Sequence, residues 1–308
     1  MITSFTQLLE RVKTGAPMRL ACAAAQDDAS LLALSEAERQ GIAVPLLVGC
    51  RAEMDDVMQR RGICFTNAQF VEAGGMEESC AAAVRLVREG QADFLMKGFA
   101  DSSIFLKAIL NRQTGLPVRA LLSHVMTFDT HGAYHKLLLT TDGGMVPDPD
   151  LDKKKKILCN ALCVARALEI DTPKVAVLCA KEKPTPRMPA TMDAAELKQA
   201  SLRGEFGEHV IVEGPIAMDI AVSAHAAAVK HFLSPVSGDA DILLMPSIEA
   251  GNIMGKTCDT LFGADAAGVV VGCDVPIVMS SRADSDASKL YSIAMGSLMA
   301  QHKGGKTP

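Results

Sequence analysis

Short runs of apolar residues alternate with longer amphipathic segments along almost the whole chain. The short runs are near-continuously apolar, which is typical of strands that are buried on both faces of a sheet. The longer segments repeat apolar positions at a spacing of three and four residues, as helices with one buried face do. This alternation predicts an α/β fold whose mainly parallel sheets are covered by helices.

The individual elements follow from the same pattern. We predict strands at 18–23, 44–48, 93–96, 119–128, 135–141, 174–179, 210–213, 242–245, 269–271 and 275–279. We predict helices at 28–40, 52–61, 77–91, 103–112, 151–169, 190–203, 218–232, 253–262 and 285–300. The pattern restarts after the turn-rich segment 142–147, which is the best candidate for a domain boundary. The prediction is therefore a first domain of residues 1–149 with the C-terminal helix at about 286–308, and a second of residues 150–285.

Composition limits the partners that the chain can have. Of 308 residues, 49% are hydrophobic and 22% charged, so the chain can fill a sizeable core. The net charge is -5, so there is no basic surplus for nucleic-acid binding, and acidic substrates need local basic groups or helix N-termini. The first ten residues lack an apolar signal core, and no apolar stretch approaches ~18 residues. We expect a cytoplasmic protein without a membrane partner.

Nine cysteines are present, an odd number, and none forms a CxxC pair. Reduced thiols, mostly buried, explain this better than disulfides or a zinc site. His131 and His135 flank a turn but lack a third ligand, so we predict no metal site. His124 lies in an apolar strand, where a hydrogen-bonded core histidine is more common than a base.

The clearest candidate for chemistry follows the last predicted strand. Hydroxyl, guanidinium and carboxylate groups occur together there, in Ser280, Ser281, Arg282, Asp284 and Asp286. Ligands collect at the carboxyl ends of parallel strands, and the planar fork of arginine matches phosphate. One of the acidic or hydroxyl residues could simply cap the last helix.

A second strand end leads into Glu249, Gly251 and Asn252. Glycine permits close backbone approach and asparagine is a good N-cap, so a helix N-terminus could face phosphate or a thioester oxygen here. An ordinary capped turn explains the same residues equally well.

Lysines mark a third strand end. Lys97 and Gly98 end the strand at 93–96, where Lys97 could bind an anion, and Lys107 lies on the next helix, where it could equally be a surface residue. The motif GxGxxG is absent from the strand-to-helix turns, which disfavours a Rossmann dehydrogenase.

Taken in order, these segments resemble the phosphate acetyltransferase and phosphate butyryltransferase family, the butyryl branch most closely. The resemblance covers nearly the whole chain and rests on residues 93–98, 189–195, 213–215 with Asp219, 238–244, 249–252, 280–285 and 289–293. It implies two three-layer α/β domains with an interdomain cleft, a fold similar to isocitrate and isopropylmalate dehydrogenases, and a homodimer or higher homo-oligomer. It also implies coenzyme A as a substrate, with no tightly bound cofactor.

The resemblance implies roles for single residues. A Ser-Arg pair at the reacting centre of the acetyl enzymes corresponds to Ser281 and Arg282. The acetyl branch has an aspartate seven residues after that serine, where this chain has Ser288. Asp284 and Asp286 lie close by in sequence, so which acid, if any, deprotonates the CoA thiol stays open.

The expected reaction is reversible transfer of a short acyl group, butyryl preferred, between coenzyme A and inorganic phosphate in a ternary complex. We expect Lys97, Gly98, Lys107, Glu249, Gly251, Asn252, Ser280 and Ser288 to bind substrate, beside the four catalytic candidates Ser281, Arg282, Asp284 and Asp286. The alternatives are a phosphate acetyltransferase, a metal- and NAD-dependent dehydrogenase of related fold, and a catalytically silent CoA- or phosphate-binding regulator.

Overall fold

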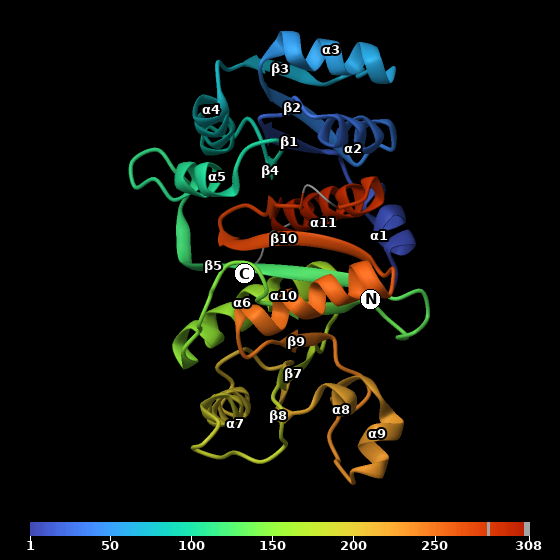
Figure 1. The fold of residues 1–308 in the computed structure, drawn as a ribbon, viewed down its shortest axis with the longest axis vertical. Helices are drawn as coiled ribbons and strands as arrows, with labels where there is room; N and C mark the ends of the chain where they lie inside the picture. Colours follow the sequence, from blue (N-terminus) through green and yellow to red (C-terminus); the bar gives the residue numbers. More distant parts are fainter. Residues whose placement is uncertain (282–283, 305–308) are drawn as a thin grey trace. The chain divides into compact units, whose positions relative to one another are not determined.

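The computed structural model describes residues 1–281 and 284–304 (Figure 1). Its internal contacts divide the chain into two compact units. Unit 1 contains residues 1–4 and 120–266, and unit 2 contains residues 5–119 and 267–308. Arg282 lies outside the described residues, so its predicted role stays a prediction.

Unit 2 is built on a mostly parallel sheet. Its strands are β1 (Met18–Ala23), β2 (Ala43–Gly49), β3 (Gln69–Glu72), β4 (Phe94–Lys97), β10 (Asp265–Cys273) and β11 (Ile277–Val278). They are ordered β3-β2-β1-β4-β11-β10, and only the β10–β11 pair is antiparallel among those whose register is described. Because β1, β4 and β11 run side by side in one direction, their carboxyl ends meet at one edge.

Helices cover both faces of this sheet. They are α1 (Phe5–Val12), α2 (Asp28–Arg39), α3 (Arg51–Arg61), α4 (Met76–Arg88), α5 (Ser102–Ile109) and α11 (Asp286–Gly304). Within the unit, α2 and α11 lie on one side of the strands, and α4 and α5 on the other (Figure 1). A Cβ at Gly296 of α11 would come within 2.8 Å of the Phe94 ring, so a glycine lets this helix approach β4 closely.

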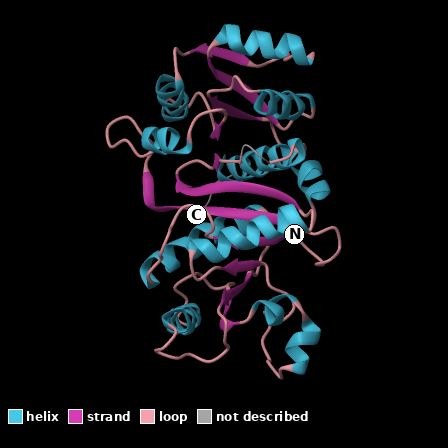
Figure 2. Cartoon of the chain, in the orientation of Figure 1, coloured by secondary structure: helices cyan, strands magenta, loops and turns pink. Residues whose placement is uncertain are grey.

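Unit 1 is also built on mostly parallel strands. Its strands are β5 (Val118–Asp129), β6 (Leu138–Thr141), β7 (Lys174–Leu178), β8 (Ile211–Ile216) and β9 (Ile242–Leu244). They are ordered β5-β6-β9-β7-β8, and β5 and β6 are antiparallel. The helices are α6 (Leu151–Ala167), α7 (Pro189–Leu202), α8 (Met218–Val222), α9 (Ala224–Val229) and α10 (Ile248–Lys256), which continues into a π-helical turn, Thr257–Leu261. Figure 2 shows the same alternation of strands and helices by colour.

An ionic cluster ties together the amino ends of β6, β9 and β7. The ammonium of Lys136, which is 7% exposed, lies 2.6 Å from the Asp241 carboxylate and 2.8 Å from that of Asp239. The backbone N–H of Lys174 donates to Asp241 at 2.8 Å, and its side chain also pairs with Asp239. These contacts hold three neighbouring strands in register at the edge opposite their carboxyl ends.

The predicted α/β fold class with mainly parallel sheets is confirmed. The sequence prediction missed α1 and β3, and the helix predicted at 218–232 is interrupted at Ser223. The hydroxyl of Ser223 accepts from the Ala226 N–H and begins a new helix, which explains the break. The predicted domain boundaries stay a prediction, while the contacts divide between residues 119 and 120 and between 266 and 267. No helix among the described residues is long and apolar enough to span a membrane.

Candidate functional site

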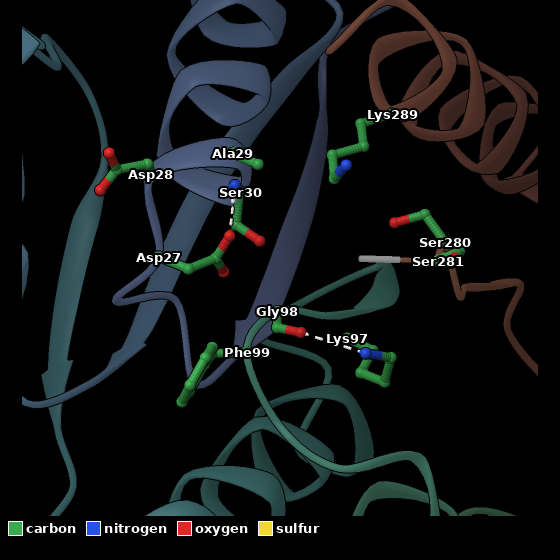
Figure 3. Close-up of a pocket in the computed structure, with 10 residues that line it drawn as sticks. All are labelled: Asp27, Asp28, Ala29, Ser30, Lys97, Gly98, Phe99, Ser280, Ser281 and Lys289. Atoms are coloured by element: carbon green, nitrogen blue, oxygen red, sulfur yellow. Dashed lines mark hydrogen bonds between the residues drawn. The ribbon is translucent and has the colours of Figure 1, made fainter. Parts of the chain in front are cut away.

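A cavity of about 280 Å³ lies in unit 2 at the carboxyl ends of β1, β4 and β11 (Figure 3). The N-terminal turn of α2 forms one wall, the end of β4 a second, and the segment after β11 with α11 a third. Four of the predicted site residues line it, namely Lys97, Gly98, Ser280 and Ser281. The topology brings them together, because their strands are neighbours in the sheet although they are far apart in sequence.

Ser281 and Asp284, which follow β11, are hydrogen-bonded to each other. The Ser281 N–H donates to Asp284 Oδ2 at 2.7 Å, and the Asp284 N–H donates back to the Ser281 carbonyl at 3.2 Å. Ser285 then caps α11, because its hydroxyl accepts from the Ser288 N–H at 3.1 Å. Asp284 therefore holds the backbone at Ser281, which lines the cavity.

Two buried lysines give the cavity positive charge. Lys97 is 6% exposed and donates to the carbonyls of Gly98 and Ala100 at 3.2 and 3.1 Å. Lys289 is 4% exposed and donates to the carbonyl of Asp284. Figure 3 shows its ammonium directed toward the space between the α2 N-terminus and Ser281. An ammonium group taken out of water is costly unless it is compensated, and the ammonium of Lys289 has no carboxylate partner among residues 1–281 and 284–304. This cavity is therefore suited to an anion.

The α2 wall carries two aspartates. Asp27 caps the helix, with Oδ1 accepting from the Ser30 N–H at 2.9 Å. Asp28 is paired with Arg61 at 2.6 Å and with Arg60 at 3.9 Å. The first turn of a helix adds a positive end to the two ammonium groups.

The backbone at Gly98 packs too closely against the end of β1 to leave room for a side chain. A Cβ there would come within 2.3 Å of the Ala24 carbonyl, so a side chain would push the end of β4 away from the end of β1. Glycine at this position therefore keeps the two strand ends together beneath the cavity.

Besides Asp284, three further predicted residues of unit 2 do not line this cavity. Lys107 is exposed on α5, and Asp286 is exposed at the start of α11. Ser288 is buried in α11, where its hydroxyl lies 3.0 Å from that of Ser285. Their roles in binding or catalysis stay predictions.

The predicted residues of unit 1 lie on α10. The expectation that Asn252 is an N-cap is wrong, because α10 begins at Ile248 after Ser247, and the Asn252 amide instead donates to the Gly143 carbonyl at 3.2 Å. Gly251 does permit a close approach, but to the chain itself. A Cβ there would lie 2.6 Å from the Asp142 carbonyl oxygen.

Glu249 is exposed in the first turn of α10. Hydrogen bonds from the Ser247 hydroxyl and from the helix backbone lower the pKa of its carboxyl. The carboxylate is therefore stabilised at this helix N-terminus, as the helix dipole favours.

His124, in β5, is a neutral imidazole at neutral pH. Burial, with the charge of Lys256 adding to it, lowers the pKa of His124 to about 4. Its Nε2 atom has no hydrogen-bond partner among residues 1–281 and 284–304, so the expectation of a fully hydrogen-bonded histidine is wrong for that atom.

His131 and His135 pair with Asp265 at 3.7 Å and with Asp239 at 2.8 Å. Within the described part of the chain, no three His, Cys, Asp or Glu side chains are placed to hold a metal ion together.

Sequence reasoning missed Asp27 and Lys289 as members of the cavity. The available signal was weak in both cases. Asp27 lies shortly after the apolar run 18–25, separated from it by Gln26, and Lys289 lies among mixed polar and apolar residues of the last helix. Only the strand order brings the two residues to the same cavity.

Comparison with known proteins identifies the family. A family model described as "Phosphate acetyl/butaryl transferase" matches residues 54–297. The chain belongs to this family. The family predicted from the sequence is therefore confirmed.

Relatives of both branches match over nearly the full length. The phosphate butyryltransferase of Clostridium acetobutylicum is 39% identical over 98% of this chain and 100% of its own. The probable phosphate butyryltransferase of Bacillus subtilis is 42% identical over 90% and 91%. The phosphate acetyltransferase of Thermotoga maritima is 36% identical over 96% and 100%.

Solved structures agree with this assignment. A branched-chain phosphotransacylase from Enterococcus faecalis V583 matches with a TM-score of 0.80 and 29% identity over 92% of this chain and 99% of its own. A 4-hydroxythreonine-4-phosphate dehydrogenase from Burkholderia phymatum, 13% identical, matches with a TM-score of 0.57 over 92% and 98%. The latter likeness concerns the fold alone and agrees with the expected similarity to a dehydrogenase fold.

Proposed function

We propose that this chain is a phosphate acyltransferase that reversibly moves a short acyl group between coenzyme A and inorganic phosphate, with butyryl preferred. Family membership supports the acyltransferase class. The preference for butyryl is supported by the phosphate butyryltransferases at 39% and 42% identity. The acetyl alternative keeps support from the 36% identical phosphate acetyltransferase.

The observation that carries the proposal is the cavity with two buried ammonium groups beside Ser281. A phosphoryl group is a compact anion, and the ammonium groups of Lys97 and Lys289 offer it positive charge. In this proposal, inorganic phosphate or the phosphoryl end of an acyl phosphate occupies this cavity.

The chemistry then needs no covalent enzyme intermediate. In the direction of thioester formation, the CoA sulfur attacks the acyl carbon, and phosphate leaves with the bonding electrons. Ser281 donates a hydrogen bond to the sulfur or to the carbonyl oxygen, and Lys289 stabilises the departing phosphate. Holding both substrates in place can contribute on the order of 7 kcal/mol, which is enough for direct transfer in a ternary complex.

Several expectations from the sequence belong to the same proposal. Arg282 offers its planar fork to phosphate, Asp284 holds the backbone at Ser281, and Glu249 and Asn252 bind substrate. We also propose that the enzyme is a cytoplasmic homodimer that uses coenzyme A as a substrate and holds no tightly bound cofactor.

The test is a thioester panel. Acetyl-, propionyl-, butyryl- and isobutyryl-CoA are incubated with the protein, with and without phosphate, and released CoA is measured with a thiol reagent. We expect release that requires phosphate and is fastest with butyryl-CoA. Fastest release from acetyl-CoA would favour the acetyl alternative, and no release from any thioester would support a silent binding protein.

A further inference from the structure

Asp27 brings to the cavity a carboxylate oxygen that no described group engages. Its Oδ1 accepts the Ser30 N–H at 2.9 Å and caps α2, whereas its Oδ2 is buried and has no hydrogen-bond partner in residues 1–281 and 284–304. A buried acceptor without a donor costs free energy, so such an oxygen in a native protein calls for an explanation. Figure 3 shows the side chain at the cavity, near Ser30, Gly98 and Phe99.

The other nearby carboxylates are already committed to other contacts or lie elsewhere. Asp284 Oδ2 accepts the Ser281 N–H at 2.7 Å, and Asp28 is paired with Arg61. Asp286 is exposed and does not line the cavity. Ser288, at the position where the resemblance would place an aspartate, cannot act as a carboxylate base.

We propose that Asp27 is the general base that accepts the proton of the CoA thiol. This inference rests on the proposed function. As the sulfur attacks the acyl carbon, the S–H proton passes to Asp27 Oδ2 and the new S–C bond forms. The C–O bond to phosphate breaks, and its electron pair leaves with phosphate. In the reverse direction, a phosphate oxygen attacks the thioester carbon, and the departing thiolate takes the proton back from Asp27.

Capping and base catalysis are compatible in one side chain. Rotation about the Cβ–Cγ bond exchanges the two carboxylate oxygens, so one oxygen can hold the Ser30 N–H while the other faces the thiol. The charged and titratable groups around Asp27 are Lys97 of β4, Lys289 of α11, Cys22 of β1 and the adjacent Asp28. The two ammonium groups also favour the thiolate that the transfer produces.

The test uses Asp27→Asn, because asparagine caps a helix as well as aspartate does but cannot take the thiol proton. The matched control is Asp150→Asn, since Asp150 caps α6 in the same way, accepting the Lys153 N–H at 2.8 Å. Asp27→Ser, which also keeps a capping group, serves as a second variant should the asparagine form fold poorly. The assay follows CoA consumption with butyryl phosphate between pH 7 and pH 9, and thermal unfolding is measured on every variant.

We expect Asp27→Asn to lower kcat/KM for CoA by about 10²-fold at pH 7, a typical loss for general-base catalysis. The deficit should shrink toward pH 9, because a free thiol with a pKa near ~8.5 then ionises without a base. Asp150→Asn should match wild type. A loss below about threefold, or an equal loss at both pH values, would overturn the inference. Wild type that is inactive at every pH would refute the proposed function instead.

Discussion

Lys289 of unit 2 and Lys136 of unit 1 are almost equally hidden from solvent, at 4% and 7% exposure, but they have different partners. Lys136 is in contact with the carboxylates of Asp239 and Asp241. Lys289 lines a cavity and donates to a backbone carbonyl, and no carboxylate of the described residues lies within ion-pair distance of it. A buried lysine paired with carboxylates serves the fold, whereas one that faces a cavity with its charge uncompensated is suited to an anionic ligand.

The largest effect should come from Lys289→Met. We expect kcat/KM for phosphate-dependent cleavage of butyryl-CoA to fall by about 300-fold, because removing one preorganised charge at a reacting group typically costs 10²- to 10³-fold. The free energy of unfolding should change by less than about 1 kcal/mol, because the removed ammonium leaves no carboxylate of the described residues without its partner. Steady-state kinetics and urea unfolding check both parts. A variant that loses stability but keeps its activity would reverse the comparison.

Lys136→Met should lower stability and leave activity unchanged. Removing one member of a buried ion pair leaves Asp241, which is 2% exposed, without its ammonium, and we expect a loss of about 3 kcal/mol in the free energy of unfolding. Below its unfolding transition the variant should keep wild-type kcat. Lys153→Met is the matched control, because its pair with Asp150 is exposed and should be worth less than about 0.5 kcal/mol. Equal losses in the two variants would contradict the structural role of Lys136.

The pH dependence of unfolding gives a second test of the structural role of Lys136. Although burial opposes it, hydrogen bonding from Lys136, Lys174 and His135 lowers the pKa of Asp239 well below its usual range. A depressed carboxyl pKa gives stability that is present above the unfolded-state value of about 3.9 and is lost as the pH falls further. We expect the urea concentration at the midpoint of unfolding of wild type to decrease as the pH is lowered below about 4. This decrease should be smaller in Lys136→Met. If the midpoint decreases equally in both proteins, the ionic cluster around Asp239 is not the cause of the acid sensitivity.

His124 should make a smaller contribution to the pH dependence of the free energy of unfolding. Because its pKa is lowered to about 4, the folded state favours the neutral ring, and stability is lost as the pH falls from about 6.5 toward 4. With partial exposure discounted, we expect a loss of about 2 kcal/mol over this range, which His124→Gln should remove. Urea unfolding at pH 7, 5.5 and 4.5 measures it. If the variant and wild type show the same slope, burial of His124 does not set this dependence.

The fold could be predicted from the sequence wherever one signal dominated. Near-continuous apolar runs such as 18–23 and 93–96 identified buried parallel strands, because both faces of such strands are covered. The start of α10 was misplaced because Gly251 and Asn252 are typical of turns, whereas here the glycine lets a helix pack on the backbone at Asp142 and Gly143. A tertiary contact overrode the local preference.

Part of the site could be predicted from local sequence, and part could not. Ser280, Ser281 and Lys97 stand at strand ends, which local sequence can locate. Asp27 and Lys289 could not be assigned, because their meeting depends on β1, β4 and β11 being neighbours, which no local pattern encodes. Lys289 is a candidate for binding phosphate because its ammonium is buried and lines the cavity, which the sequence alone does not indicate.

The most direct test of this account is equilibrium binding of inorganic phosphate, measured by broadening of the ³¹P resonance, to wild type, Lys289→Met and Lys136→Met at a temperature where all three are folded. We predict that wild type and Lys136→Met broaden the signal equally and that Lys289→Met broadens it far less. Undiminished broadening by folded Lys289→Met would mean that phosphate binds elsewhere, and the cavity between α2, β4 and α11 would lose its assigned role.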